Sequence, residues 1–222
     1  MCSVSTTAQR LNVATKFDSY ANLPTDDEAA RLDAFYEALR NQSQVRGVLI
    51  GYNQTTVAPG IFLRRLYGDR RYLVEMRGLD ADRVVVVEGG YREKFTIELW
   101  LVPNESPPPT PTLASPPPVN SGKRLLFDEE CLECAPAVGL DLYGLSDGLQ
   151  FYANALKREP LARGLIVVRP GQDIGTRGAL TEARKARRLL IREHKIDDSR
   201  IAISIARRRK DNVSTAQMWI IK

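Results

Sequence analysis

The sequence Arg46-Gly47-Val48-Leu49-Ile50 is followed, 117 residues later, by the closely similar Arg163-Gly164-Leu165-Ile166-Val167. With this constant offset the two halves of the chain align without a gap from Leu32 to Val84 of the first copy. The matched pairs are Leu32 and Leu149, Phe35 and Tyr152, Arg70-Arg71 and Arg187-Arg188, Asp80 and Asp197, and Arg83 and Arg200. A chance match in hydrophobicity would not also keep glycine and charged residues in one register, so the sequence indicates a tandem duplication.

The alignment extends toward both ends of the repeat with two changes in length. A two-residue insertion in the second copy brings Trp100 onto Trp219. At the other end, Phe17-Asp18 matches Phe127-Asp128 if the second copy has about seven extra residues. We therefore expect both copies to fold alike.

Each copy has the hydrophobic pattern of a helix, a strand, a second helix and two further strands. In the first copy the expected elements are a helix from Thr25 with a Thr-x-x-Glu capping box, a buried strand over 47–52, a helix over 61–77, a buried strand over 83–87 and an alternating strand over 95–101. The apolar face of the first helix is Leu32, Phe35, Tyr36 and Leu39. The predicted fold class is α/β, in the form of an α+β sandwich: two tandem units, each a mixed β-sheet with two helices packed on one face.

A proline-rich segment separates the two copies. Residues 103–122 contain eight prolines among Ser, Thr, Asn and Glu. Such a segment cannot bury enough apolar surface to fold alone, so we expect an extended, semi-rigid spacer. The predicted domains are a first unit at 1–102, the linker at 103–122 and a second unit at 123–222.

The composition is that of a globular protein, with 43% hydrophobic and 27% charged residues. No run approaches the roughly 18 consecutive apolar residues of a membrane helix, and no signal peptide is visible. As written, the chain is expected in the cytoplasm or at the periphery of a membrane, and in the periplasm if its N-terminus is processed or misassigned. Residues 1–122 have 13 basic and 14 acidic side chains, and residues 123–222 have 19 and 13, so an acidic partner is expected to bind the second half.

Part of the second copy resembles the OmpA-like domain. The pattern begins with Asp173-x-Gly175, continues with Leu180-Thr181-Glu182-Ala183-Arg184 on a basic helix, and ends with Asp197-Asp198-Ser199-Arg200-Ile201. The first copy is similar through Arg64-Arg65 and the stretch from Arg77 to Val84. Both copies are also similar to modules of uncharacterised bacterial envelope proteins, so the resemblance implies two degenerate OmpA-like units.

In OmpA-like domains a loop aspartate and a helix arginine hold the diaminopimelate of peptidoglycan. An aspartate pairs with the ligand ammonium, and the planar guanidinium binds its carboxylate. The resemblance implies Arg65, Asp173 and Arg184 as ligand-binding candidates. Neither copy has both halves of this grip, because Arg65 has no matching acid in its copy and Glu182 occupies the arginine position of the other.

Cys131 and Cys134 form a Cys-x-x-Cys motif in the residues that only the second copy has. Such a motif can supply two of the four ligands of a zinc site. The chain has one further cysteine, Cys2, and one histidine, His194. Unpaired thiols, a disulfide bond and a partial metal site all stay open for Cys131 and Cys134, and no cofactor is predicted.

Two surfaces are candidates for binding a partner. One is the basic surface of the second copy, with Arg187, Arg188, Arg207, Arg208 and Arg209. It suits an acidic protein or lipid surface, whereas nucleic acid is not expected because aromatic residues are not interleaved with the arginines. The other is the pair Trp100 and Trp219, on the face of the last strand opposite its core residues, where each is either covered within the molecule or exposed as an anchor.

No spacing of histidine, acid and nucleophile matches a catalytic site, so the chain is not predicted to be an enzyme. The predicted function is that of a non-enzymatic interaction or scaffold protein, an accessory or peripheral subunit of a larger bacterial, membrane-associated complex. The alternatives are a periplasmic peptidoglycan-binding protein and a basic-face binder of an acidic protein, lipid or nucleic acid.

Overall fold

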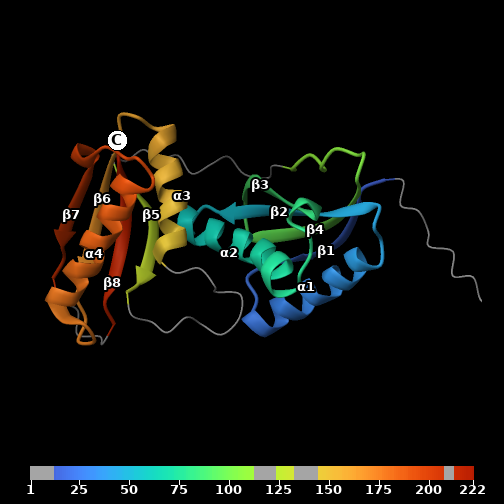
Figure 1. Cartoon of the computed structure of the whole chain (residues 1–222), viewed down its shortest axis with the longest axis horizontal. Helices are drawn as coiled ribbons and strands as arrows, with labels where there is room; N and C mark the ends of the chain where they lie inside the picture. Colours follow the sequence, from blue (N-terminus) through green and yellow to red (C-terminus); the bar gives the residue numbers. More distant parts are fainter. Residues whose placement is uncertain (1–12, 113–123, 133–144, 208–212) are drawn as a thin grey trace, which may run out of the picture. The chain divides into compact units, whose positions relative to one another are not determined.

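The computed structural model describes residues 13–112, 124–132, 145–207 and 213–222. Within these ranges the chain is an α+β protein with two four-stranded mixed sheets, which confirms the predicted fold class (Figure 1). The first set of elements is β1 (Thr15–Tyr20), α1 (Thr25–Arg40), β2 (Val45–Gln54), α2 (Pro59–Arg71) with a π-helical turn (Tyr72–Met76), a 3-10 turn (Ala81–Arg83), β3 (Val84–Arg92) and β4 (Thr96–Pro103). The second set is β5 (Arg124–Cys131), α3 (Leu145–Arg158), β6 (Arg163–Arg169), α4 (Gly175–Arg192), a 3-10 turn (Asp198–Arg200), β7 (Ile201–Ile205) and β8 (Thr215–Ile221).

The two sheets have the same strand order, β1-β4-β2-β3 and β5-β8-β6-β7. In each sheet the last strand pairs antiparallel with the first and second strands, and the second and third strands are parallel. The register is repeated as well. Gly47 lies opposite Leu101 and Val84, and Gly164 lies opposite Ile220 and Ile201. The repeat seen in the sequence is therefore also present in the strand pairing.

The sequence-based prediction omitted the first strand of each unit, β1 and β5. Both are edge strands, and β1 is mostly exposed, so it lacks the alternating pattern by which a half-buried strand is recognised. Each strand also has a bulge, at Phe17 in β1 and at Phe127 in β5, where the pairing with the last strand is interrupted. The shared bulge gives a structural reason for the Phe-Asp match between the copies.

The start of α1 was predicted correctly, but its capping box does not form. The N-cap is Pro24, and no side chain caps the helix. The Glu28 side chain is buried, and the Glu28 N–H donates to the Pro24 carbonyl at 3.1 Å. Pro24, rather than Thr25, is therefore the N-cap of α1.

Two matched arginines in each copy bind matched backbone carbonyls. Arg83 donates to the carbonyls of Leu39, Gln42 and Val45, and Arg200 to those of Leu156, Glu159 and Ala162. Arg70 donates to the carbonyls of Val84 and Ala81, and Arg187 to those of Ile201 and Asp198. These arginines satisfy carbonyls where a helix ends or a strand begins, so their shared register reflects the fold. Arg187, which the sequence analysis named as a partner-binding candidate, therefore also binds the backbone of its own unit.

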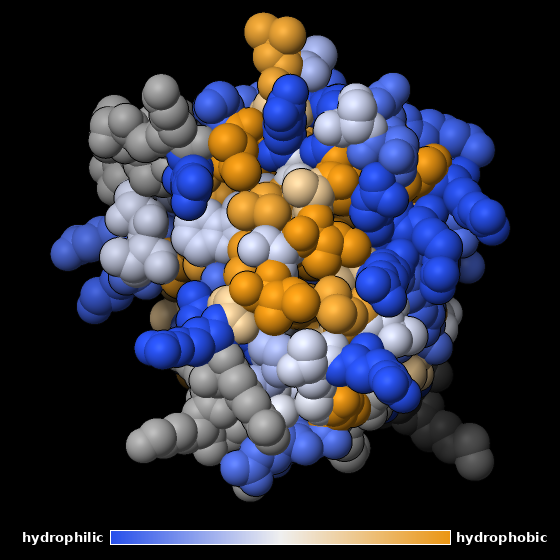
Figure 2. All heavy atoms as spheres, turned by 90° about the vertical axis from the view of Figure 1, so that its left-hand side faces the viewer, coloured by the Kyte–Doolittle hydropathy of each residue, from blue (hydrophilic) through white to orange (hydrophobic). Residues whose placement is uncertain are grey.

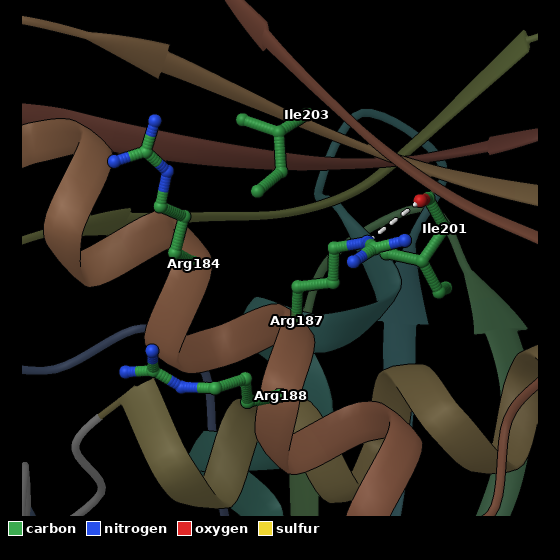
Figure 3. A pocket seen from close by; sticks show the side chains of 5 residues that line it. All are labelled: Arg184, Arg187, Arg188, Ile201 and Ile203. Carbon is green, nitrogen blue, oxygen red and sulfur yellow. Dashed lines mark hydrogen bonds between the residues drawn. The ribbon is translucent and has the colours of Figure 1, made fainter. Parts of the chain in front are cut away.

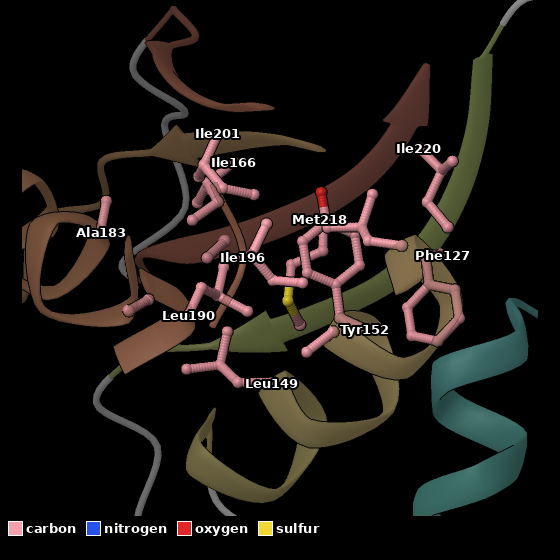
Figure 4. Close-up of a cluster of buried hydrophobic side chains, with 14 of the residues drawn as sticks. Phe127, Leu149, Tyr152, Ile166, Ala183, Leu190, Ile196, Ile201, Met218 and Ile220 are labelled. Carbon is pink, nitrogen blue, oxygen red and sulfur yellow. The ribbon is translucent and has the colours of Figure 1, made fainter. Parts of the chain in front are cut away.

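The glycine of each Arg-Gly pair lies where a helix approaches the sheet closely. A Cβ on Gly47 would lie 2.8 Å from Leu39 Cδ1, and a Cβ on Gly164 would lie 2.6 Å from the Tyr152 hydroxyl oxygen. In the second unit this close approach helps to form a core between the sheet and the two helices, including Phe127, Leu149, Tyr152, Ile166, Leu190 and Met218 (Figure 4).

The chain divides into two compact units whose boundaries differ from the domain limits read from the sequence. The first consists of residues 1–54 and 69–117, and the second of residues 55–68 and 118–222. The beginning of α2 therefore belongs to the second unit. There Leu63 packs against the core, and the rings of Tyr67 and Phe151 lie 5.1 Å apart between centroids.

Residues 103–112, which we call the strap, were expected to be part of a spacer but bind to the first sheet. Arg46 Nη2 donates to the Ser106 carbonyl at 2.7 Å, and the Thr112 N–H donates to the Tyr52 hydroxyl at 3.1 Å. Arg92 donates to the Thr112 carbonyl and stacks on the Tyr52 ring, 3.4 Å from its centroid. Prolines cannot donate a backbone hydrogen bond, and the first sheet holds the strap by the carbonyls of Ser106 and Thr112 and by the Thr112 N–H. None of the helices in the described ranges is both long enough and apolar enough to cross a membrane.

Candidate anion-binding groove of the second unit

Helix α4 has one face that packs on the sheet and one that is charged. Its buried residues are Ala179, Ala183, Ala186 and Leu190. Because three of these side chains are small, the helix can lie close to the sheet. Arg184 and Arg188, four residues apart, lie on one exposed side of the same helix.

Strand β7 forms the open edge of the second sheet next to this helix. It pairs on one side with β6, and the sheet ends there. Ile203 is half-buried against the core, and Ile205 is exposed. An apolar strand edge therefore lies beside a row of arginines.

Helix and strand enclose an open groove, which we call the arginine groove. It is lined by Arg184, Arg187, Arg188, Ile201 and Ile203 and has a volume of about 510 Å³. In Figure 3 Arg187 reaches from α4 to the Ile201 carbonyl, while Arg184 and Arg188 leave the helix in other directions. The structure thus brings together three arginines that the sequence analysis assigned to two different roles.

The three guanidinium groups differ in their partners. Arg187 is held by the carbonyls of Ile201 and Asp198 and by an ion pair of 2.6 Å with the Asp198 carboxylate. Neither Arg184 nor Arg188 forms a hydrogen bond or an ion pair with any residue that the structure describes. Two cationic groups with unused donors therefore lie beside an apolar wall.

The corresponding positions of the other copy are Tyr67 and Arg71. The Tyr67 ring packs on Phe151, and Arg71 pairs with Glu75 at 2.8 Å. Because one copy folds without free arginines at these positions, the fold does not require them in the other. Two guanidinium groups can instead bind carboxylates or phosphates through paired N–H donors.

The three peptidoglycan-binding candidates lie in different parts of the structure. The Asp173 carboxylate accepts hydrogen bonds from the Ser214 hydroxyl, the Ser214 N–H and the Ile174 N–H, which hold its pKa below the ordinary value. The Asp173 carboxylate thus links the residues at the start of β8 to those at the start of α4. Arg65 lies in α2, and Arg184 lies in the arginine groove, so the acid and the arginines serve separate sites.

Trp100 and Trp219 occupy equivalent positions and are partly buried. Each donates its indole N–H to the side chain two residues earlier, Trp100 to Glu98 at 3.0 Å and Trp219 to Gln217 at 3.2 Å. Trp100 lies on the sheet face that the strap binds, beside Val48 and Ile50. Each tryptophan is thus placed on the predicted face.

The structure describes only some of the remaining candidate residues, which are the arginines after β7 and the Cys-x-x-Cys motif. Arg207 is exposed after β7, whereas Arg208 and Arg209 lie outside the described residues. Cys131 at the end of β5 is disulfide-bonded, which removes the unpaired-thiol interpretation for this residue, and Cys134 lies outside the described residues. Within the described ranges no three potential metal ligands lie together.

The sequence analysis missed a buried charge cluster in the second unit. Arg64 Nη2 lies 2.9 Å from Asp128 Oδ1, and Arg64 Nε lies 3.1 Å from Glu130 Oε1. Burial raises the pKa of the Asp128 carboxyl, and the Arg64 guanidinium opposes that shift. Gly60 leaves room for this cluster, because a Cβ there would lie 2.5 Å from the Asp128 side chain. The repeat alignment does single out Asp128, because it matches Asp18, but the sequence does not show that the Asp128 side chain is buried.

Comparison with known proteins adds no family assignment: the chain matches no protein-family model, and no curated protein matches it.

Proposed function

We propose that the protein is a non-enzymatic interaction protein whose second unit binds an acidic segment of a partner protein in the arginine groove. One observation carries this proposal. Arg184 and Arg188 present exposed guanidinium groups, free of partners in the described part of the chain, beside the apolar wall of the groove. The net charge of +6 in residues 123–222, from 19 basic and 13 acidic side chains, favours approach of an acidic partner.

The edge strand favours a polypeptide over a free anion as the ligand. The Ala206 N–H donates to the Val168 carbonyl of β6, and alternate residues of a strand direct their backbone groups to the same side. The backbone groups of Ile201, Ile203 and Ile205 therefore face away from β6, and Arg187 binds the Ile201 carbonyl. Ile203 and Ile205 can pair with an added strand, whose acidic side chains would meet Arg184 and Arg188.

A role as an accessory subunit of a larger, membrane-associated bacterial assembly is part of the same proposal. Peptidoglycan binding through an OmpA-like grip is the weaker alternative, because the Asp173 carboxylate is engaged by Ser214. The resemblance to OmpA-like domains remains a prediction.

The test is binding of a fluorescently labelled hexaglutamate peptide, measured by anisotropy at several salt concentrations. A hydrogen bond to a charged group contributes about 1.5–3 kcal/mol, so Arg184→Glu with Arg188→Glu is expected to weaken binding about tenfold or more. The matched control is Arg177→Glu with Arg192→Glu, which reverses two other exposed charges of α4. That control should lose no more than about threefold, through long-range electrostatics alone.

Two results would contradict the proposal. Equal losses in the two double variants would mean that overall charge, rather than the groove, attracts the peptide. Equal affinity for a hexathymidylate would mean that the surface binds any polyanion, and the alternative of a generic basic-face binder would then replace this proposal.

A further inference from the structure

The face of the second sheet that is turned away from α3 and α4 is apolar and uncovered in part. In β6 the residues Gly164, Ile166 and Val168 face the helices, so Leu165 and Val167 face the other way. The apolar residues of this outer face are Leu126, Leu165, Val167, Ala202, Trp219 and Ile221, and each is at least partly exposed. At the end of the molecule where Figure 1 places β7, hydrophobic side chains form a continuous band between hydrophilic ones (Figure 2).

The equivalent face of the first sheet has an occupant. Val48 and Ile50, which match Leu165 and Val167, are 0% and 1% exposed in the cluster on the strap side of the sheet. The strap is held at Ser106 by Arg46 and at Thr112 by Tyr52. The two contacts are six residues apart in the strap and six residues apart in β2, a spacing that suits the extended conformation that prolines favour.

The second unit has arginines at the two positions that hold the strap in the first, where Arg46 donates to the strap and the Tyr52 hydroxyl accepts from it. Arg163 matches Arg46, and Arg169 matches Tyr52. Arg163 is exposed and has no hydrogen bond or ion pair within the described residues, and Arg169 Nε is buried without a hydrogen-bond partner there. Between them lies the apolar floor of Leu165 and Val167, with Trp219 paired to Leu165 on β8.

We propose that this outer face binds an extended, proline-rich segment of a partner protein at the two positions that match those at which the first sheet holds its own strap, with a second donor, Arg169, in place of the Tyr52 hydroxyl. Arg163 and Arg169 donate to backbone carbonyls six residues apart in the ligand. The proline rings pack on Leu165, Val167 and Trp219. Prolines suit this mode because their backbone carbonyls stay free to accept and the extended conformation costs little entropy on binding.

The strap itself supplies the probe. A synthetic peptide with the sequence of residues 103–112 is titrated into the full chain with Trp100→Phe, so that fluorescence reports on Trp219, the other of the two tryptophans. We expect a saturable change with a weak affinity, because a free peptide lacks the millimolar effective concentration of a tethered strap. Arg163→Ala should weaken binding about tenfold through loss of a charge-assisted hydrogen bond, and Val167→Glu should abolish it.

The matched controls are Arg192→Ala, an exposed arginine of α4, and a peptide in which glycine replaces every proline. The first should bind as the parent does, and the second should not bind detectably. A signal that survives in Val167→Glu, or is the same for the glycine peptide, would overturn the proposal, as would the absence of any saturable change at millimolar peptide. Self-association of the chain that the peptide does not compete would also overturn it, since a second copy would then occupy the face.

Discussion

The two sheets have one strand order and one register, yet their outer faces differ in what lies on them. On the first sheet Val48 and Ile50 are buried on the face whose Arg46 and Tyr52 hold the strap, whereas on the second sheet Leu165 and Val167 are partly exposed. The same contrast holds for the helix side, where Arg184 and Arg188 have no partner among the residues that the structure describes, while Arg71 pairs with Glu75. Residues that hold the fold together are thus repeated, whereas several residues on the two exposed surfaces are not.

The matched aspartates Asp18 and Asp128 show the same divergence inside the fold. Asp18 pairs with Arg31 on α1, and the two side chains are 28% and 41% exposed. The position that matches Arg31 is Gly148, where a Cβ would lie 2.4 Å from Glu130 Oε1. Asp128, whose side chain is 0% exposed, pairs with Arg64 instead. One acid is therefore neutralised at the surface and the other in the interior.

The largest expected effect separates these two ion pairs. Arg64→Ala should lower the free energy of unfolding by about 3–5 kcal/mol, because it leaves the Asp128 carboxylate buried and unpaired. Arg31→Ala should cost only about 0–1 kcal/mol, as is usual for an exposed pair. Urea unfolding of both variants measures the difference, and equal losses would contradict the assigned burial.

The loss in Arg64→Ala should depend on pH. Burial already raises the pKa of Asp128 above 3.8, and removal of Arg64 takes away the main opposing interaction. A carboxyl whose folded pKa lies above its unfolded value destabilises the fold at pH values above both, and protonation relieves this as the pH falls. The gap between the variant and the parent should therefore be widest near neutral pH and narrow toward pH 3.8, whereas a constant gap would mean that Asp128 is not the group left unpaired.

The matched arginines Arg83 and Arg200 make equivalent contacts in the two units, so their substitution should lower the stability by similar amounts. Each binds three backbone carbonyls in its own unit. We expect Arg83→Ala and Arg200→Ala each to cost about 2–4 kcal/mol, because the carbonyls lose their donor in a part-buried site. Thermal unfolding should show losses of similar size, with Arg192→Ala as a control near zero. Loss in one variant alone would show that the two sites are not equivalent.

The smallest expected effect tests the difference between the outer faces. Arg46→Ala should destabilise the first unit by about 1–2 kcal/mol, because the strap loses a charge-assisted hydrogen bond at Ser106. Arg163→Ala in the isolated protein should change stability by no more than about 0.5 kcal/mol, since its guanidinium is exposed and has no described partner. Chemical denaturation compares the pair, and a marked loss in Arg163→Ala would show that part of this chain already uses that arginine.

Much of the fold could be predicted because its signals are local or repeated. The apolar face of α1 and the strands β2, β3 and β4 follow from hydrophobic periodicity, although β3, which was predicted to be buried, is a mostly half-buried edge strand. The edge strands β1 and β5 escaped prediction because a bulge interrupts each strand, and β1 is also mostly exposed. The capping box at Thr25 failed because a short pattern does not specify which residue becomes the N-cap.

The candidate sites were only partly predictable. Arg184, Arg187 and Arg188 could be named from charge, but the sequence does not show that Asp198 and the Ile201 carbonyl hold Arg187 and leave the other two free. The strap was read as a spacer because its prolines exclude regular structure. That argument says nothing about side chains elsewhere that bind its carbonyls.

By itself, the sequence determined that one α+β module occurs twice, in which positions the copies match, and that basic charge gathers in the second. Periodicity and internal repetition are properties of neighbouring residues and of one alignment, so no coordinates are needed to read them. Only the tertiary structure decided which charges are neutralised, since Arg64 and Asp128, or Arg46 and Ser106, are about sixty residues apart in the chain. Contacts over such separations depend on how the sheets and helices pack, and the free donors that mark a binding surface are those that this packing leaves without a partner.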